Sequence, residues 1–283
     1  MIKKHKNKND YWMEQGVFVR DLTKENVMPL DINDLNQEKD YSLFLENENT
    51  NHFKKYVVLD HETISHSKII IISDGFEFDE VHKQLYKFKK DITIIAVNGA
   101  LKKWKLVGKN CPEAEKRAIG YYVVNNPYVE CMWFLPREHS YYPKCIASTR
   151  TNHNFLSKYQ GLKYVYNSVQ DKKYSGVSSN GYRHFDDYRN PICAALSLAY
   201  SFNAKKIALL SCDEVYQDEK PGMIKSENNL YCYPQQIKSN LFIDGMCYWL
   251  NKENIKIVHN SIGIKLNNSE YINIDNLIDF FEE

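Results

Sequence analysis

Asn190–Tyr216 reads NPICAALSLAYSFNAKKIALLSCDEVY, and this stretch decides the fold because a helix rich in small residues runs directly into an apolar strand. Proline at the first helical position and alanines spaced at helical intervals predict a helix over Pro191–Asn203. Ile207–Cys212 is apolar without alternation, as expected for a strand that helices cover on both faces of a parallel sheet. Ser211 and Asp213 follow at its carboxyl end, where α/β proteins bind ligands.

The same alternation of apolar strand and amphipathic helix recurs along the chain. Ile69–Ile72 is a fully apolar strand, and a turn and a helical stretch over Asp79–Lys90 follow it. Further strands are expected at Ile92–Asn98, Tyr121–Asn126, Cys145–Thr149, Lys163–Asn167 and Ile255–Ser261, and further helices at Pro234–Lys252 and Ile274–Phe281. This order predicts an α/β fold with a doubly wound, mainly parallel, Rossmann-like sheet.

The first 55 residues differ from the rest because they are polar and show no sustained apolar period. We therefore expect an N-terminal extension or arm over residues 1–55 and one Rossmann-like α/β domain over residues 56–283. An arm of this kind is suited to contacts with neighbouring proteins.

Composition narrows the class of partner and the compartment. Lys and Arg total 37 against 36 Asp and Glu, so bulk charge favours neither nucleic acid nor an anionic membrane as partner. No run of 18 apolar residues occurs, and no apolar segment of signal-peptide length follows the basic start. The seven cysteines form no CxxC pair, which disfavours structural zinc and a disulfide framework. We expect a cytoplasmic protein without a membrane span.

Short polar residues and glycines follow the expected strands. The candidates for nucleotide binding are Ser73, Asp74, Gly75, Asn98, Gly99, Asn125 and Asn126. Because the carboxyl ends of parallel strands share one edge of the sheet, these side chains are expected to line one crevice, where they can bind phosphate, ribose and base. Asp213 has two readings: a catalytic carboxylate in that crevice, or a cap for the segment that follows.

Further candidates lie outside the strand ends. His184 beside two aspartates is a candidate acid or base, and Arg183 and Arg189 could neutralise a diphosphate; the alternative is a solvated charged loop within Asp171–Asn190. Arg150 follows a strand near an expected helix start, a second candidate anion site or a plain cap. No spacing of His, Cys or Glu matches a metal site, and we expect neither a metal nor a cofactor. The GxSxG elbow of a serine nucleophile and the Walker phosphate-binding loop are also absent.

Over roughly Lys68–Ser261 these residues resemble the Rossmann-like glycosyltransferases of the Campylobacter-type bacterial sialyltransferases and the related hydroxymethylpterin diphosphokinase and motility-associated glycosyltransferase family. The family's Gly-Asn-Gly-Pro-Ser-Leu turn corresponds to Ser73–Phe78, where one glycine remains. The family's strand-ending asparagine is matched by Asn98, its Tyr-Asn-Pro by Asn125–Pro127, and its Gly-x-Asp by Ser211–Asp213.

The resemblance implies a nucleotide- or nucleotide-sugar-binding transferase, with a glycosyltransferase as the specific activity. The catalytic histidine of the sialyltransferases would lie within Leu230–Gln236, which contains no histidine, and Tyr233 there is a poor base. The alternative is a catalytically inactive derivative of the fold that serves as a structural or assembly protein, for example a virion component.

Overall fold

The computed structural model describes residues 65–108, 118–135, 142–168, 187–213, 234–262 and 266–283, with shorter pieces at 43, 46–47, 50–51, 57–58, 184–185, 215–221, 223–225 and 230–232. Most of the expected N-terminal extension and most of the expected loop before residue 187 lie outside these residues.

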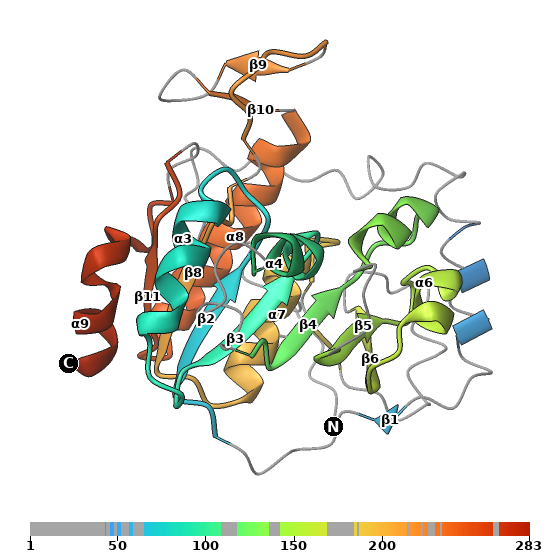
Figure 1. Ribbon diagram of the computed structural model, residues 1–283, viewed down its shortest axis with the longest axis horizontal. Coiled ribbons are helices and arrows are strands. Elements are labelled where there is room, and N and C mark those ends of the chain that lie inside the picture. Colours follow the sequence, from blue (N-terminus) through green and yellow to red (C-terminus); the bar gives the residue numbers. More distant parts are fainter. Residues whose placement is uncertain are drawn as a thin grey trace, which may run out of the picture.

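Ten strands in the described part of the chain form one sheet, in the order β1-β6-β5-β4-β3-β2-β8-β11-β12, with β7 paired to β6 (Figure 1). They are β1 (Val57–Val58), β2 (Lys68–Ile72), β3 (Thr93–Val97), β4 (Tyr121–Val124), β5 (Lys144–Ser148), β6 (Lys163–Ser168), β7 (His184–Phe185), β8 (Lys206–Leu210), β11 (Lys256–His259) and β12 (Glu270–Tyr271). Every pair in this sheet is parallel. The prediction of a doubly wound, mainly parallel α/β sheet is therefore confirmed.

Helices cover both faces of the sheet. They are α3 (Phe78–Gln84), α4 (Ala100–Gly108), α6 (His153–Lys158), α7 (Pro191–Ser201), α8 (Pro234–Lys252) and α9 (Leu277–Glu282), with 3-10 turns η2 (Leu85–Lys87), η3 (Val129–Phe134) and η6 (Ile274–Asn276). A short antiparallel hairpin, β9 (Ile224–Lys225) with β10 (Tyr231–Cys232), projects beyond the sheet (Figure 1).

Two hydrophobic cores form because alternate residues of each strand point to opposite faces. In β2, Ile69 and Ile71 pack with α7 and α8, whereas Ile70 and Ile72 pack with α3, α4 and α9. All four are fully buried, and each contributes about 1.5–3 kcal/mol relative to an exposed side chain. The absence of polar alternation in β2 follows from this burial on both sides.

Helix α7 lies across β2, β3 and β4. Its Ala194, Ala195 and Ala199 are fully buried, and their small side chains let the helix lie close to the strands. The helix ends at Ser201, slightly before the predicted Asn203, which adopts a φ of 58° that asparagine tolerates. Two other predicted helices are broken by 3-10 turns: Asp79–Lys90 becomes α3 and η2, and Ile274–Phe281 becomes η6 and α9.

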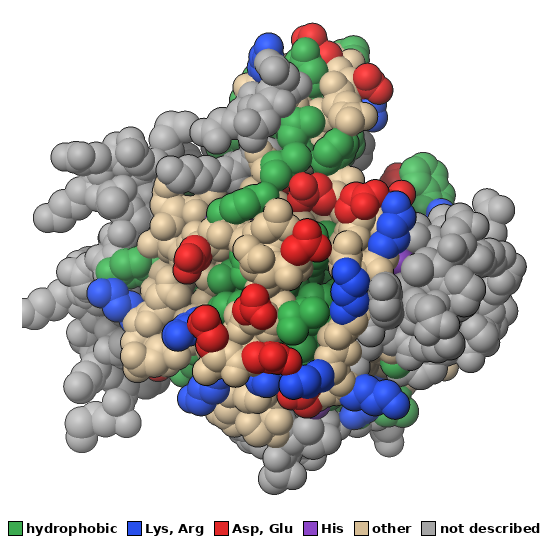
Figure 2. Space-filling model, turned by 60° about the vertical axis from the view of Figure 1, so that its left-hand side comes forward, with side chains coloured by type: hydrophobic (Ala, Val, Ile, Leu, Met, Phe, Trp, Pro, Cys, Tyr) green, Lys and Arg blue, Asp and Glu red, His purple; other side chains and the backbone are tan. Residues whose placement is uncertain are grey.

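None of the helices in the described ranges has the length and apolar composition needed to cross a bilayer. The face on the side of α3 and α9 carries acidic and basic side chains interspersed with one another (Figure 2).

Candidate functional site

The strand order brings two sets of loops to the carboxyl edge of the sheet: those that follow β2 and β8, and those that follow β3 to β6. From the central β2 the chain winds outward through β3, β4, β5 and β6, and then returns through α7 to β8 on the other side of β2. The order of strands therefore reverses between β2 and β8, the switch point at which ligands bind in many open α/β sheets.

The two loops at the switch point contact each other directly. The Gly75 backbone N–H donates to the Ser211 carbonyl oxygen at 3.0 Å, and the Ser73 N–H donates to the Leu210 oxygen at 3.1 Å. A Cβ atom at Gly75 would overlap the backbone carbonyl oxygens of Ser211 and Asp213. Glycine is needed here for close approach of protein backbone, which closes this part of the edge.

A polar network surrounds this contact. Asn260 Nδ2 donates to Glu77 Oε2 at 2.7 Å, and Asn260 Oδ1 accepts from the Ser211 N–H at 2.8 Å. Asp213 is buried, and its Oδ2 accepts from the Ile262 N–H at 3.1 Å. Desolvation, and then the negative charge of Asp213, raise the pKa of Glu77 to about 7. Ser73 is buried beside this network, and Asp74 packs against Gly99.

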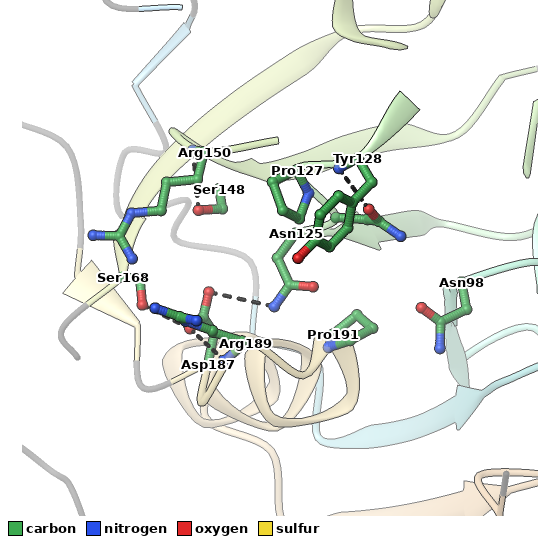
Figure 3. A pocket seen from close by; sticks show the side chains of 11 residues that line it. Asn98, Asn125, Pro127, Tyr128, Ser148, Arg150, Ser168, Asp187, Arg189 and Pro191 are labelled. Carbon is green, nitrogen blue, oxygen red and sulfur yellow. Dashed lines mark hydrogen bonds between the residues drawn. The ribbon is translucent and has the colours of Figure 1, made fainter. Parts of the chain in front are cut away.

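A cleft of about 260 Å³ opens farther along the same edge, over the ends of β3, β4, β5 and β6 and the start of α7 (Figure 3). It is lined by Asn98, Asn125, Asn126, Pro127, Tyr128, Ser148, Arg150, Ser168, Asp187, Arg189 and Pro191. Arg150, Asp187 and Arg189 lie on one side in this view, Asn98 lies on the other, and Asn125 stands between them.

Two arginines and a helix N-terminus give the cleft its positive character. Arg150 is 5% exposed, and Arg189 is half-buried. Tyr188 and Arg189 have φ values of 44° and 55°, so a left-handed turn carries Arg189 to the start of α7. Asn190 caps this helix through its Oδ1, which accepts from the Ile192 N–H at 2.7 Å. Guanidinium groups beside a helix N-terminus are suited to phosphate or carboxylate.

Asp187 organises the floor of the cleft. Its Oδ1 accepts from Ser168 Oγ at 2.6 Å and from the Arg189 N–H at 3.1 Å. Its Oδ2 accepts from Tyr166 Oη at 3.0 Å and from Asn125 Nδ2 at 3.4 Å. Burial, and then the charge of Asp187, raise the pKa of Tyr166 well above its ordinary value, so the phenol stays a neutral donor. These bonds satisfy the carboxylate and orient Asn125.

The strand-end asparagines are also held in place. Asn98 follows β3 with a φ of 51°, and its carbonyl oxygen accepts from Tyr122 Oη at 2.9 Å. Asn126 Oδ1 accepts from the Tyr128 N–H at 2.8 Å, which tightens the turn after β4.

The structure brings five of the predicted residues together in the cleft: Asn98, Asn125, Asn126, Arg150 and Arg189. Ser73, Asp74, Gly75, Gly99 and Asp213 lie instead at or beside the switch point and are not among its lining residues. The backbone of His184 belongs to β7, but its side chain, and all of Arg183, lie outside the described residues. The roles assigned to all these residues stay predictions.

Sequence reasoning did not place Ser168 or Pro191 in the site, and it named Asp187 only as a carboxylate beside His184. The Asn-Pro pair at 190–191 signals a helix start, and it could have marked the residues before it as neighbours of a helix N-terminus. In the described ranges, no group of three or more His, Cys, Asp or Glu side chains is placed to hold a metal ion.

Comparison with known proteins identifies the fold. No family model and no curated protein matches the sequence. Among solved structures, the chain is similar to the MAf glycosyltransferase from Magnetospirillum magneticum AMB-1, with a TM-score of 0.63 and 12% sequence identity. The match covers 83% of this chain and 38% of that one, so this chain spans well under half of its structural neighbour. The likeness supports a glycosyltransferase-like fold, whereas the resemblance to sialyltransferases stays a prediction.

Proposed function

We propose that this chain binds a nucleotide sugar in the cleft and transfers the sugar to an acceptor, as a glycosyltransferase. The observation that carries the proposal is the convergence of Arg150, Arg189 and the α7 N-terminus on a cleft at the carboxyl edge of a parallel sheet. Sugar transfer leaves a nucleotide with growing negative charge, and cationic groups fixed before the reaction stabilise that charge in the transition state.

The other residues of the cleft fit a nucleotide. Asn98, Asn125 and Asn126 present amide groups that can both donate and accept hydrogen bonds with ribose and base. The cleft volume of about 260 Å³ lies slightly below the roughly 300–1,000 Å³ that small-molecule sites occupy. It therefore suits the diphosphate and one attached ring, with the rest of the ligand extending along the edge.

The acceptor hydroxyl needs a base, and Asp213 remains the proposed one. Asp213 lies buried at the closed switch point, so this role requires the loops after β2 and β8 to separate when the donor extends there from the cleft. Ser73, Asp74, Gly75 and Gly99 would then line the space between the separated loops. Asp213→Asn is then expected to lower the rate of transfer while leaving nucleotide affinity unchanged.

Thermal unfolding tests the binding step. The ligands are CMP, UDP, GDP, ATP and GTP, together with the nucleotide sugars of CMP, UDP and GDP. A ligand present at 100 times its Kd stabilises the native state by about 2.7 kcal/mol, which raises the Tm. We expect one base to give the largest rise. An unchanged Tm with every nucleotide at millimolar concentration would remove the transferase proposal.

An exposed hydrophobic surface favours the second candidate, an inactive descendant with an assembly role. Val129 and Trp133 of η3 are 58% and 71% exposed, next to Tyr128 in the cleft wall, and such groups of side chains often mark protein contacts. In this case the purified chain forms oligomers, and Trp133→Ser converts them to monomers on size-exclusion chromatography. A wild-type chain that is monomeric at high concentration contradicts this candidate.

A further inference from the structure

We propose that Asn47 and Asn51, in the expected N-terminal extension, are positioning residues that hold the loops forming one wall of the cleft. The proposal rests on the proposed function, because the loops in question carry Arg150 and the turn at Asn126–Tyr128. Both asparagines are buried, with exposed fractions of 0% and 1%. A polar side chain at this depth is costly unless it makes hydrogen bonds.

Asn51 binds the backbone on both sides of Arg150. Its Nδ2 donates to the Thr149 carbonyl oxygen at 3.0 Å and to the Thr151 carbonyl oxygen at 2.7 Å. One amide group therefore fixes the 149–150 peptide, which adjoins Arg150, and the 151–152 peptide, which lies one residue beyond it. The Arg150 backbone lies between these two anchored peptides, so its conformation sets the direction in which the guanidinium leaves the loop.

Asn47 binds the neighbouring turn and the start of α6. Its Nδ2 donates to the Pro127 carbonyl oxygen at 3.0 Å, and its Oδ1 accepts from the His153 N–H at 3.2 Å. The same oxygen lies 3.0 Å from His153 Nδ1, so that ring nitrogen carries the proton. Pro127 lines the cleft, and Asn47 thus holds the turn after β4 against α6.

The two loops are also bonded to each other, and the asparagines complete this network. The Asn152 N–H donates to Asn126 O at 3.0 Å, and Thr151 Oγ1 donates to Val124 O at 3.0 Å. Pro127 O accepts from Asn152 Nδ2 at 3.3 Å as well as from Asn47. Loss of the asparagines would leave buried carbonyl oxygens with fewer donors, which is costly, and the loops would open to find water.

The test compares Asn51→Ala and Asn47→Ala with Thr50→Ala. Thr50 is a matched control because its Oγ1 donates to Glu46 O at 2.7 Å, within the same segment and away from the cleft loops. Hydrogen exchange of the amides at 149–152 is expected to be at least tenfold faster in Asn51→Ala than in the wild type, and unchanged in Thr50→Ala. Asn47→Ala is expected to speed exchange mainly at 152–153.

Inorganic pyrophosphate serves as the probe of the cleft, and calorimetry measures its Kd. We expect about tenfold weaker binding in Asn51→Ala and a change below twofold in Thr50→Ala. Phe281→Leu, in the core at the far end of the sheet, controls for lost stability: it is expected to lower the Tm without changing exchange at 149–152 or the Kd.

Exchange and binding separate this proposal from the proposed function. If the wild type does not bind pyrophosphate, the proposed anion site fails, and exchange at 149–152 alone decides whether the asparagines hold the wall. Unchanged exchange in both asparagine variants overturns the proposal, as does an equal acceleration in Phe281→Leu.

Discussion

The switch point between β2 and β8 and the cleft over β3 to β6 share one edge of one sheet, yet they differ in what fills the space beyond the strands. At the switch point, backbone meets backbone: Gly75 packs on the carbonyl oxygens of Ser211 and Asp213, with carboxylates around it. At the cleft, side chains stand apart around a cavity with two arginines. Strand order identifies the edge at which ligands bind, whereas loop packing decides where along that edge there is room.

The largest expected effect tests whether the switch point is closed. Gly75→Ala places a Cβ against two backbone oxygens that cannot rotate away, so we expect a loss of about 3 kcal/mol in the free energy of unfolding, measured with urea. Gly99→Ala is the control, since its Cβ would meet the carboxylate of Asp74, a side chain that can rotate away at the cost of its hydrogen bonds to Ser73 and the Gly99 backbone. Equal losses in the two variants would mean that backbone packing does not close the switch point.

The next effect tests the charge of the cleft. Arg150→Met removes a buried guanidinium, and charged hydrogen bonds contribute about 1.5–3 kcal/mol, so we expect a 10- to 100-fold higher Kd for pyrophosphate. Lys144→Met is the control because Lys144 begins β5, at the opposite end of the strand that Arg150 follows. An affinity that falls equally in both variants would indicate general charge attraction and no cleft site.

A third effect concerns α3, the helix that follows the closed switch point. His82 is fully buried between Phe78 and Trp104, neither ring nitrogen has a hydrogen-bond partner in the described structure, and burial lowers its pKa to about 4. As pH falls below about 6.5, His82 takes up a proton in the unfolded chain but stays neutral in the native chain. The free energy of unfolding therefore falls by about 2 kcal/mol between pH 7 and pH 5.

His82→Leu removes this group, and its urea stability should fall less than that of the wild type over the same range of pH. The pH-dependent loss of stability in the wild type, relative to His82→Leu, is expected to be large at pH 5 and small at pH 7. The same pH dependence in both proteins would contradict the burial of a neutral imidazole.

The smallest effect tests the carboxylates of the switch point. The pKa of Glu77 is raised, so its charged form is disfavoured in the native state, and the stabilisation present below about pH 4.5 is lost as pH rises through about 7. Glu77→Gln should therefore raise the Tm at pH 8 and not at pH 4.5. The gain should stay below about 1 kcal/mol because water reaches the half-buried side chain.

Glu80→Gln is the control for that measurement. Glu80 lies on the exposed side of α3, the helix that begins directly after Glu77, and its Oε1 is 2.8 Å from Lys83 Nζ. Its replacement should not stabilise the protein at pH 8. A gain in both variants would assign the effect to the net charge of α3 and not to the neighbourhood of Asp213.

The sequence predicts the sheet well because burial on both faces leaves a direct mark: uninterrupted apolar runs such as Ile69–Ile72. It also brings Asn98, Asn125 and Arg150 to one place, since residues that follow parallel strands share an edge. It does not predict the contact of Gly75 with Ser211, because a glycine that approaches a phosphate and a glycine that approaches a backbone carbonyl have the same sequence pattern.

The buried polar residues are harder to predict. Asn47 and Asn51 stand in a polar segment with the composition of an arm, and an amide buried against carbonyl oxygens has no apolar signature. Asp187 could be read as a partner of His184, but its role depends on donors from Tyr166, Ser168 and Asn125, which the sequence does not place beside it.

Helix α7 has a consequence for how the protein can change. Its first turn borders the arginines, its alanines lie on β2, β3 and β4, and its last residue leads into β8. At 11 residues it spans about 16 Å and is stiff over that length. A bulkier residue at Ala195 would lift the helix as one piece, so one substitution over the middle of the sheet should change both the ligand affinity of the cleft and the position of the chain where it enters β8.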